Sequence, residues 1–323
     1  MTFGIINAIS RCRSAGKGNI VMEPLASASV LQSTWSRTAN RLKLTIDRTR
    51  WIALALSAVA ALLAAVASQI QAPQPPAQDH LRLSLAVGSA VLLGVVSFLS
   101  ARLLGGTQVA AWTRIRAASE ALKREIYKYA ASTAPYDDPA QAKGRFNAER
   151  EEIANDIDDL IGLLEREEGP GSAPTAAFQS PDEYVQKRVH SQIKWYNDRA
   201  AKYGGLAKSL RWIEFTLSLV AAIVTAVVGV AGKTDLFGFS FDFVALTAVL
   251  TTIGGAILAH IEASRYDFLV ATFRAASRRL GHELSQAPSV FAMPSSDWSS
   301  FVERCETIFS TENSSWIAKF GKA

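Results

Sequence analysis

Four uncharged apolar stretches alternate with strongly polar segments along the chain. None of them contains Asp, Glu, Lys, Arg or His, and they form two close pairs, Trp51–Ile70 with Leu83–Ala101 and Phe215–Ala231 with Phe243–Ala259. Each has about the 17 to 25 residues that a helix needs to cross about 30 Å of hydrocarbon. The pattern predicts an integral membrane protein whose four transmembrane helices form two hairpins.

The segments outside these spans are rich in charge, although the average over the whole chain is ordinary. Only 20% of the 323 residues are charged, because this average mixes apolar spans with polar segments. The polar segments are long and show helical spacing of apolar residues. We therefore expect an all-α fold in which the two hairpins carry long amphipathic helices on one side of the membrane.

Basic residues lie beside the ends of the spans and not in the turns. The turns within the two hairpins carry only Arg82 and Lys233. The positive-inside rule then places both termini and the central segment in the cytoplasm. The net charge of +5 could indicate nucleic acid, but basic residues gathered beside spans favour lipid headgroups as the anionic partner.

A ten-residue pattern occurs twice and predicts an internal duplication. The pattern Arg-Ala-Ala-Ser-x-x-Leu-x-x-Glu occupies residues 116–125 and again 274–283, a shift of 158 residues. Upstream, Trp51 follows Arg50 as Trp212 follows Arg211, a shift of 161 residues. Each half thus reads as a helix with a tryptophan, a two-span hairpin and a helix bearing the repeated pattern. We expect a tandem parallel repeat.

The segment between the repeats and the C-terminal segment complete the predicted organisation. An acidic helix is expected from Gly144 to Glu168, followed by a Gly/Pro linker, and the apolar spacing after Ser295 predicts one more helix. The expected units are an N-terminal tail (1–30), a first two-span module (31–130), the acidic helix with its linker (131–181), and a second two-span module with the C-terminal helix (182–323).

The sequence offers no constellation of residues for catalysis. The four histidines lie in different segments, and there is no nucleophile elbow, phosphate-binding glycine loop or zinc-ligand spacing. We therefore expect no enzyme activity and no catalytic, cofactor-binding or metal-binding residue.

Small residues recur every four positions within the spans, which lets helix backbones approach closely. One interpretation is packing within each hairpin; the other is an interface between copies or a pore wall. The candidate residues are Ala61, Ala65, Ala86, Ala90, Gly94, Ala222, Ala226, Thr252 and Ala256.

Ionisable residues near the membrane boundary are a second candidate feature. Glu214 starts the third span and His260 ends the fourth, so in an antiparallel hairpin they lie at similar depth. They could pair and line the mouth of a pore, or they could simply reach the interface. The third candidate feature is a set of arginines on the two repeated helices, which could contact a ligand or lie beside anionic lipid. These residues are Arg114, Arg116, Arg274, Arg278 and Arg279.

Two segments support a resemblance to a known family: Arg211-Trp212-Ile213-Glu214, and Tyr266-Asp267-Phe268-Leu269, which leads to the second repeated pattern. Together with the tandem layout of hairpins and helices, these segments resemble the SLATT superfamily. That name stands for SMODS and SLOG-associating two-transmembrane-helix effectors, which overlap the family DUF4231. The resemblance covers Leu31 to Leu284. It implies an effector of a bacterial conflict or antiphage system in the inner membrane that oligomerises and opens a pore, with a nucleotide-sensing or nucleotide-producing partner protein. A membrane scaffold that recruits cytosolic partners is the alternative.

Overall fold

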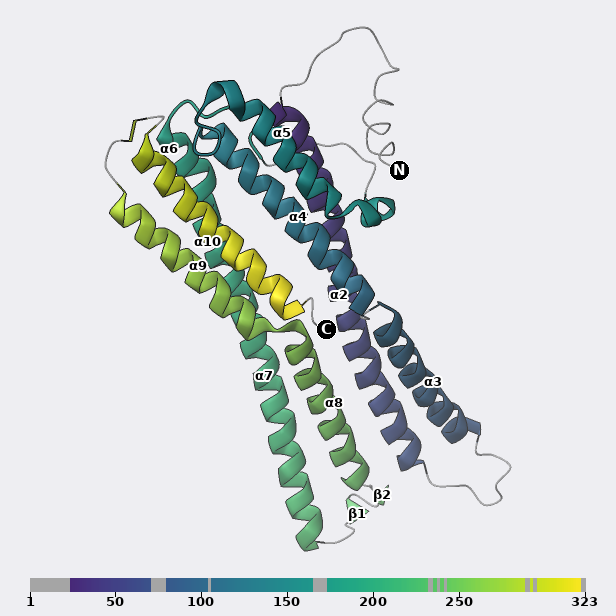
Figure 1. The fold of residues 1–323 in the computed structure, drawn as a ribbon. Helices are drawn as coiled ribbons and strands as arrows, with labels where there is room; N and C mark the ends of the chain where they lie inside the picture. The colour runs from purple at the N-terminus through teal and green to yellow at the C-terminus, as the bar shows by residue number, and fades with distance from the viewer. Residues whose placement is uncertain are drawn as a thin grey trace.

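The protein is an elongated helical molecule in which two hairpins extend from one end of a helical body (Figure 1). The computed structural model describes residues 24–70, 80–103, 106–164, 173–231, 235–236, 239–240, 243–287, 291–292 and 295–320. Within these ranges, four helical segments contain stretches long and apolar enough to cross a membrane. The four predicted spans are thereby confirmed.

The first half consists of three helices in the predicted order. Helix α2 (Pro24–Gln69) is continuous from the body into the first span, because the segment after Pro24 holds no glycine or proline that would interrupt it. Helix α3 (His80–Leu103) is the second span, and α4 (Gly106–Ala130) carries the first copy of the repeated pattern back through the body.

The second half follows the same order. The short α6 (Pro181–Tyr184) and the π-helical turn η4 (Val185–His190) lead into α7 (Ser191–Ala231), which runs from the body through the third span. The two-residue strands β1 (Asp235–Leu236) and β2 (Phe239–Ser240) pair within the hairpin turn. Helix α8 (Phe243–Ser264) is the fourth span, α9 (Tyr266–Gln286) carries the second pattern, and α10 (Ser296–Phe320) is the predicted C-terminal helix.

The predicted acidic helix has different limits in the structure. Helix α5 (Pro139–Asn155) begins five residues before Gly144, because Asp138 accepts a hydrogen bond from the backbone N–H of Ala140 and Pro139 is at the first helical position. After α5 the chain tightens into the 3₁₀ helix η3 (Asp158–Leu163), where Ile161 is exposed, whereas Phe146, Ile153 and Ile157 before it are buried. The remainder of the predicted helix, 165–168, lies outside the described residues.

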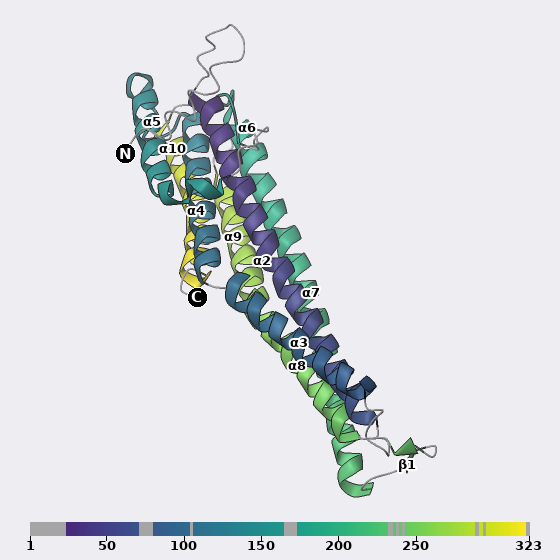
Figure 2. The ribbon, with the colours of Figure 1, turned by 90° about the vertical axis from the view of Figure 1, so that its right-hand side faces the viewer.

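The spans stand in a row and not in a closed bundle. Their main contacts run from α3 to α2, from α2 to α8 and from α8 to α7 (Figures 1 and 2). Helices α3 and α7 therefore form the two outer edges of the row. Most side chains in the apolar windows of the spans are exposed within a single copy, so the row leaves large surfaces for lipid or for another protein.

The two halves share one core in the helical body, by which we mean α4, α5, α6, η4, α9, α10 and the N-terminal parts of α2 and α7. Each repeated helix packs on the long helix of its own half, α4 on α2 and α9 on α7, and α10 packs on both repeated helices. Corresponding leucines, Leu122 and Leu280, are fully buried. The corresponding serines also match: Ser119 accepts a hydrogen bond from Gln32 Nε2 on α2, and Ser277 donates one to Asn197 on α7. The halves are arranged as a tandem parallel repeat.

Candidate functional site

The predicted small-residue positions lie mostly on the outer surfaces of the row of spans. Ala61 is buried, and Ala65 and Ala256 are half-buried. The remaining six are exposed, and five of them belong to the outer helices α3 and α7. These exposed positions are Ala86, Ala90, Gly94, Ala222, Ala226 and Thr252. Packing within the hairpins therefore does not account for them.

A different face of α3 makes the first hairpin contact. Ser89 is buried and its hydroxyl donates a hydrogen bond to the carbonyl oxygen of Ala60 at 2.8 Å. A Cβ added at Gly88 would lie 3.7 Å from Leu63 Cδ1, an ordinary contact. In lipid such interhelical hydrogen bonds and close contacts hold helices together, because apolar surface gains nothing by leaving other hydrocarbon. The exposed stripe Ala86–Ala90–Gly94 is thus left unused by the hairpin.

The predicted pair of Glu214 and His260 is not formed. Glu214 accepts a hydrogen bond from the hydroxyl of Ser218, one turn further along α7. His260 is buried where α2, α8 and α9 meet, with its Nε2 3.1 Å from the hydroxyl of Tyr266 and its ring 4.3 Å from that of Trp51, centroid to centroid. Helix α2 covers His260, so the imidazole is enclosed by protein. It therefore neither pairs with Glu214 nor extends to the membrane interface, which were the two predicted arrangements.

The two repeated helices differ in how their arginines are used. On α4, Arg114 makes two hydrogen bonds of 2.7 Å to the carboxylate of Asp159, and Arg116 pairs with Glu120 at 3.0 Å. On α9, the exposed Arg274, Arg278 and Arg279 have no hydrogen bond or ion pair with any described residue. Both helices run away from the spans into the body (Figure 1), so neither lies along a membrane surface.

A buried ion pair links α10 to the start of the second half. The guanidinium of Arg188 donates two hydrogen bonds to the carboxylate of Glu306, from Nε at 2.9 Å and from Nη2 at 2.7 Å, and Tyr184 donates a third at 3.0 Å. The side chains of Arg188 and Glu306 are only 2% and 0% exposed. The rings of Tyr127 and Phe309 lie on the guanidinium, with centroids 4.2 and 4.3 Å from its carbon. Although burial alone would lower it, the carboxylate of Glu306 raises the pKa of Arg188, so the pair stays ionised.

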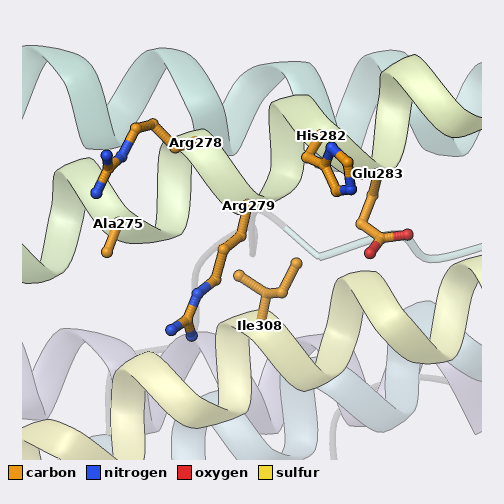
Figure 3. A pocket seen from close by; sticks show the side chains of 6 residues that line it. All are labelled: Ala275, Arg278, Arg279, His282, Glu283 and Ile308. Atoms are coloured by element: carbon orange, nitrogen blue, oxygen red, sulfur yellow. The ribbon is translucent and has the colours of Figure 1, made fainter.

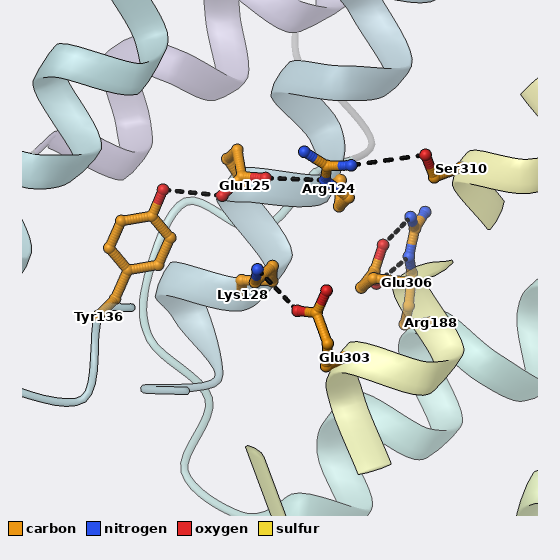
Figure 4. A network of polar contacts seen from close by, with 8 residues as sticks. All are labelled: Arg124, Glu125, Lys128, Tyr136, Arg188, Glu303, Glu306 and Ser310. Atoms are coloured by element: carbon orange, nitrogen blue, oxygen red, sulfur yellow. Dashed lines mark hydrogen bonds and ion pairs between the residues drawn. The ribbon is translucent and has the colours of Figure 1, made fainter. Parts of the chain in front are cut away.

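Further polar contacts join α10 to α4 (Figure 4). Lys128 pairs with Glu303 at 2.7 Å, and Arg124 donates to the hydroxyl of Ser310 at 3.4 Å. Arg124 also donates to Glu125, which accepts a second hydrogen bond of 2.7 Å from the hydroxyl of Tyr136. On the other side of α10, Arg304 pairs with Glu283 of α9 at 2.7 Å. Helix α10 is therefore held to both repeated helices and to η4 by charged groups.

Sequence reasoning did not identify this network. A signal was present, because Glu306 directly follows Cys305 on the apolar face of the predicted C-terminal helix, and a carboxylate on such a face requires a cationic partner. Nothing in the sequence pointed to Arg188, which lies 118 residues earlier. The π-helical turn η4 that carries Arg188 is a rare element that often marks functional sites.

Glu120 adds an acidic group with an unusual pKa near this network. Burial alone would raise its pKa, but the surrounding cations Arg116, Lys123 and Arg188 lower it to about 2.

Among the described residues, no group of three or more His, Cys, Asp or Glu side chains is placed to hold a metal ion.

Two family matches cover the two halves of the chain. Residues 33–144 match the family described as protein of unknown function DUF4231, and residues 184–316 match SMODS and SLOG-associating 2TM effector domain 1. The matches fall on the first and second repeats respectively. No curated protein and no solved structure matches the chain.

Proposed function

We propose that this chain, which carries a DUF4231 region and a SMODS and SLOG-associating 2TM effector domain in tandem, permeabilises a membrane by assembling into an oligomer. The effector domain belongs to a family associated with conflict and antiphage systems. The site of action in this proposal is the bacterial inner membrane, with both termini in the cytoplasm. The trigger is a nucleotide-linked signal delivered by a nucleotide-sensing or nucleotide-producing partner protein.

The observation that carries the proposal is the exposure of small residues on both outer helices of the row. Ala86, Ala90 and Gly94 follow one face of α3, and Ala222 with Ala226 follows one face of α7. Another face of α3 closes the first hairpin, and Ala222 and Ala226 are exposed on α7, so these small residues remain available to a second copy. Small residues at intervals of four are the pattern by which helices associate closely in lipid.

The open row of spans agrees with assembly of several copies. Because the main contacts run in one line from α3 to α7, one copy encloses no central space among its spans. A pathway for ions then has to form between copies, with α3 of one row against α7 of the next as the simplest repeating contact. A head-to-tail contact of this kind closes into a ring when its rotation allows.

The body supplies an element that can control this assembly. Helix α10 contacts both repeated helices, and each of these is connected to a span, α4 to α3 and α9 to α8. A movement of α10 would therefore act on both hairpins at once. In this proposal the buried Arg188–Glu306 pair holds α10 in the resting position.

The test is inducible expression, alone and together with a candidate partner protein that supplies the signal, in a bacterial host with a dye that reports membrane potential. Ala90→Leu and Ala222→Leu place a bulky side chain on each stripe, and we expect both to abolish depolarisation at unchanged protein levels in the membrane. Ala55→Leu is the matched control, because Ala55 is exposed in α2 but lies outside the stripes. It should depolarise the cells as the unchanged chain does.

The alternative function is a membrane scaffold that recruits cytosolic partners through its body. It predicts no depolarisation by any variant, even when a nucleotide-producing or nucleotide-sensing partner protein is expressed together with the chain. Depolarisation that survives both stripe substitutions would instead show that the oligomer does not form through α3 and α7.

A further inference from the structure

An open hollow of about 420 Å³ lies between α9 and α10, in the second half of the body (Figure 3). Its size is within the range of about 300 to 1,000 Å³ that is usual for small-molecule sites. Arg279 extends from α9 towards α10 beside Ile308, and Ala275 is the other apolar wall. Arg278, His282 and Glu283 complete the lining.

The polar lining of this hollow carries positive charge that nothing in the described chain neutralises. The side chains of Arg278, Arg279 and His282 make no hydrogen bond or ion pair with any described residue. The single acidic group of the lining, Glu283, already pairs with Arg304 at 2.7 Å. Two guanidinium groups and an imidazole in the lining are therefore free to donate hydrogen bonds to a ligand.

The internal repeat shows that the fold does not require this charge. With the shift of 158 residues, Arg278 corresponds to Glu120 of α4, and Arg279 corresponds to Ala121. In α4 the glutamate pairs with Arg116 four residues earlier. In α9 the same spacing places Arg274 and Arg278 together, a like-charge arrangement that destabilises a helix. The corresponding Ala, Ser and Leu positions are buried in both helices, so their packing does not depend on the added arginines.

The position of the hollow argues against lipid headgroups as the source of negative charge. Arg278 lies twelve residues beyond Tyr266 in α9, which is about 18 Å along the helix at 1.5 Å per residue. Helix α9 rises from the end of α8 away from the spans (Figure 1). The headgroup layer adds only about 5 to 8 Å on each side of the hydrocarbon.

We propose that this hollow binds a small soluble anion that carries phosphate groups. Guanidinium groups match phosphate oxygens with two parallel hydrogen bonds, and the lining holds two of them, Arg279 directed towards α10 and Arg278 extending in another direction from the neighbouring position of α9. Ala275 and Ile308 offer apolar contact to the rest of the ligand. Since Ile308 belongs to α10, the bound anion bridges α9 and α10. Binding requires neither an oligomer nor a pore, so it stands or falls separately from the proposed permeabilisation.

The test uses the full-length protein in nanodiscs of neutral lipid, with inorganic pyrophosphate as the probe in isothermal titration calorimetry. We expect saturable binding that weakens at least tenfold in Arg278→Glu, a change that also permits an ion pair with Arg274. Lys143→Glu is the matched control, since Lys143 is exposed on α5 and the substitution changes the net charge by the same amount. It should weaken binding less than twofold.

A second variant separates recognition from charge. Arg279→Lys keeps the positive charge but loses the two parallel hydrogen bonds, so binding should weaken about three- to tenfold while the melting temperature stays unchanged. Equal effects of Arg278→Glu and Lys143→Glu would overturn the proposal, because they would show only diffuse attraction. Absence of saturable binding to the unchanged protein would overturn it as well. So would loss of pyrophosphate binding in nanodiscs that contain phosphatidylglycerol, because headgroups would then occupy the hollow.

Discussion

Replacing Glu306 by Gln should strongly destabilise the helical body, although the two side chains have nearly the same size. The carboxylate accepts three hydrogen bonds, two from Arg188 and one from Tyr184, and it is fully buried. Glutamine keeps the shape and one acceptor oxygen, but it leaves the charge of Arg188 uncompensated. The rings of Tyr127 and Phe309 offset only part of that charge.

The expected loss in the free energy of unfolding is about 3 to 5 kcal/mol, the usual cost of breaking a buried ion pair by removing one partner. If the body unfolds as a unit of roughly 200 residues, each kcal/mol lowers the melting temperature by about 2 to 4 °C, so a decrease of at least about 6 °C is expected. Replacing both partners, as in Arg188→Met with Glu306→Leu, should restore most of this loss. An apolar pair of similar volume removes the uncompensated charge.

The assay is thermal unfolding of the full chain in nanodiscs, followed by intrinsic tryptophan fluorescence. Trp298 makes it sensitive to α10, because this tryptophan is buried and donates a hydrogen bond to the carbonyl oxygen of Ala131. The control is Glu303→Gln, which removes the partner of Lys128 but changes a side chain that is 57% exposed, and should lower the melting temperature by less than about 2 °C. A loss in the free energy of unfolding below about 1 kcal/mol for Glu306→Gln would refute this reasoning. So would a double variant whose loss equals the sum of the losses for Arg188→Met and Glu306→Leu alone.

Three further predictions test other parts of the body. The pKa of Glu120 is lowered to about 2 from an ordinary value of 4.5, so the ionised carboxylate should stabilise the folded body by about 3 kcal/mol above pH 4.5, and this stability should be lost as the pH falls towards 2. Glu120→Gln should remove that part of the pH dependence of unfolding, and an unchanged pH profile would contradict this reasoning. Burial raises the pKa of the Cys305 thiol, so a maleimide should label this thiol only after unfolding. The measurement uses a variant in which the other cysteine is replaced, and Glu306→Gln should accelerate labelling. Rapid labelling of the native protein would show that α10 is not packed as described. Leu122→Ala and Leu280→Ala remove corresponding buried side chains and should each cost about 2 to 5 kcal/mol in chemical unfolding, whereas a negligible cost for either would contradict equivalent packing of the two repeated helices.

The sequence alone was sufficient for the features that depend on composition and local order. Uncharged runs of sufficient length predict spans because hydrocarbon tolerates no unpaired backbone group or charge, and the structure contains all four. The repeated pattern predicted two equivalent halves, and the matching burial of Leu122 and Leu280 confirms it. The apolar spacing also predicts the C-terminal helix, and in the structure Trp298 and Phe301 of this helix are fully buried.

Local capping explains where the predicted limits of an element were wrong. The spacing of apolar residues predicts an acidic helix from Gly144 onwards, but the start of a helix is set by its cap and not by this spacing. Asp138 followed by Pro139 is the start signal, and it begins α5 earlier. Beyond Asn155 the apolar residues continue at similar spacing, yet the backbone tightens into η3 and Ile161 becomes exposed.

Only the tertiary structure decided which faces of the helices meet. Small residues every four positions are compatible with packing inside a hairpin or outside it, and the row of spans placed Ala90 and Ala222 outside. Similar depth in the second hairpin predicts that His260 could pair with Glu214, but in the structure Trp51 of α2 covers the imidazole. Arg188 and Glu306 lie 118 residues apart and belong to elements whose contact no local pattern specifies. Periodicity determines which residues share a face of one helix, whereas the partner of that face depends on how all the helices fill space together.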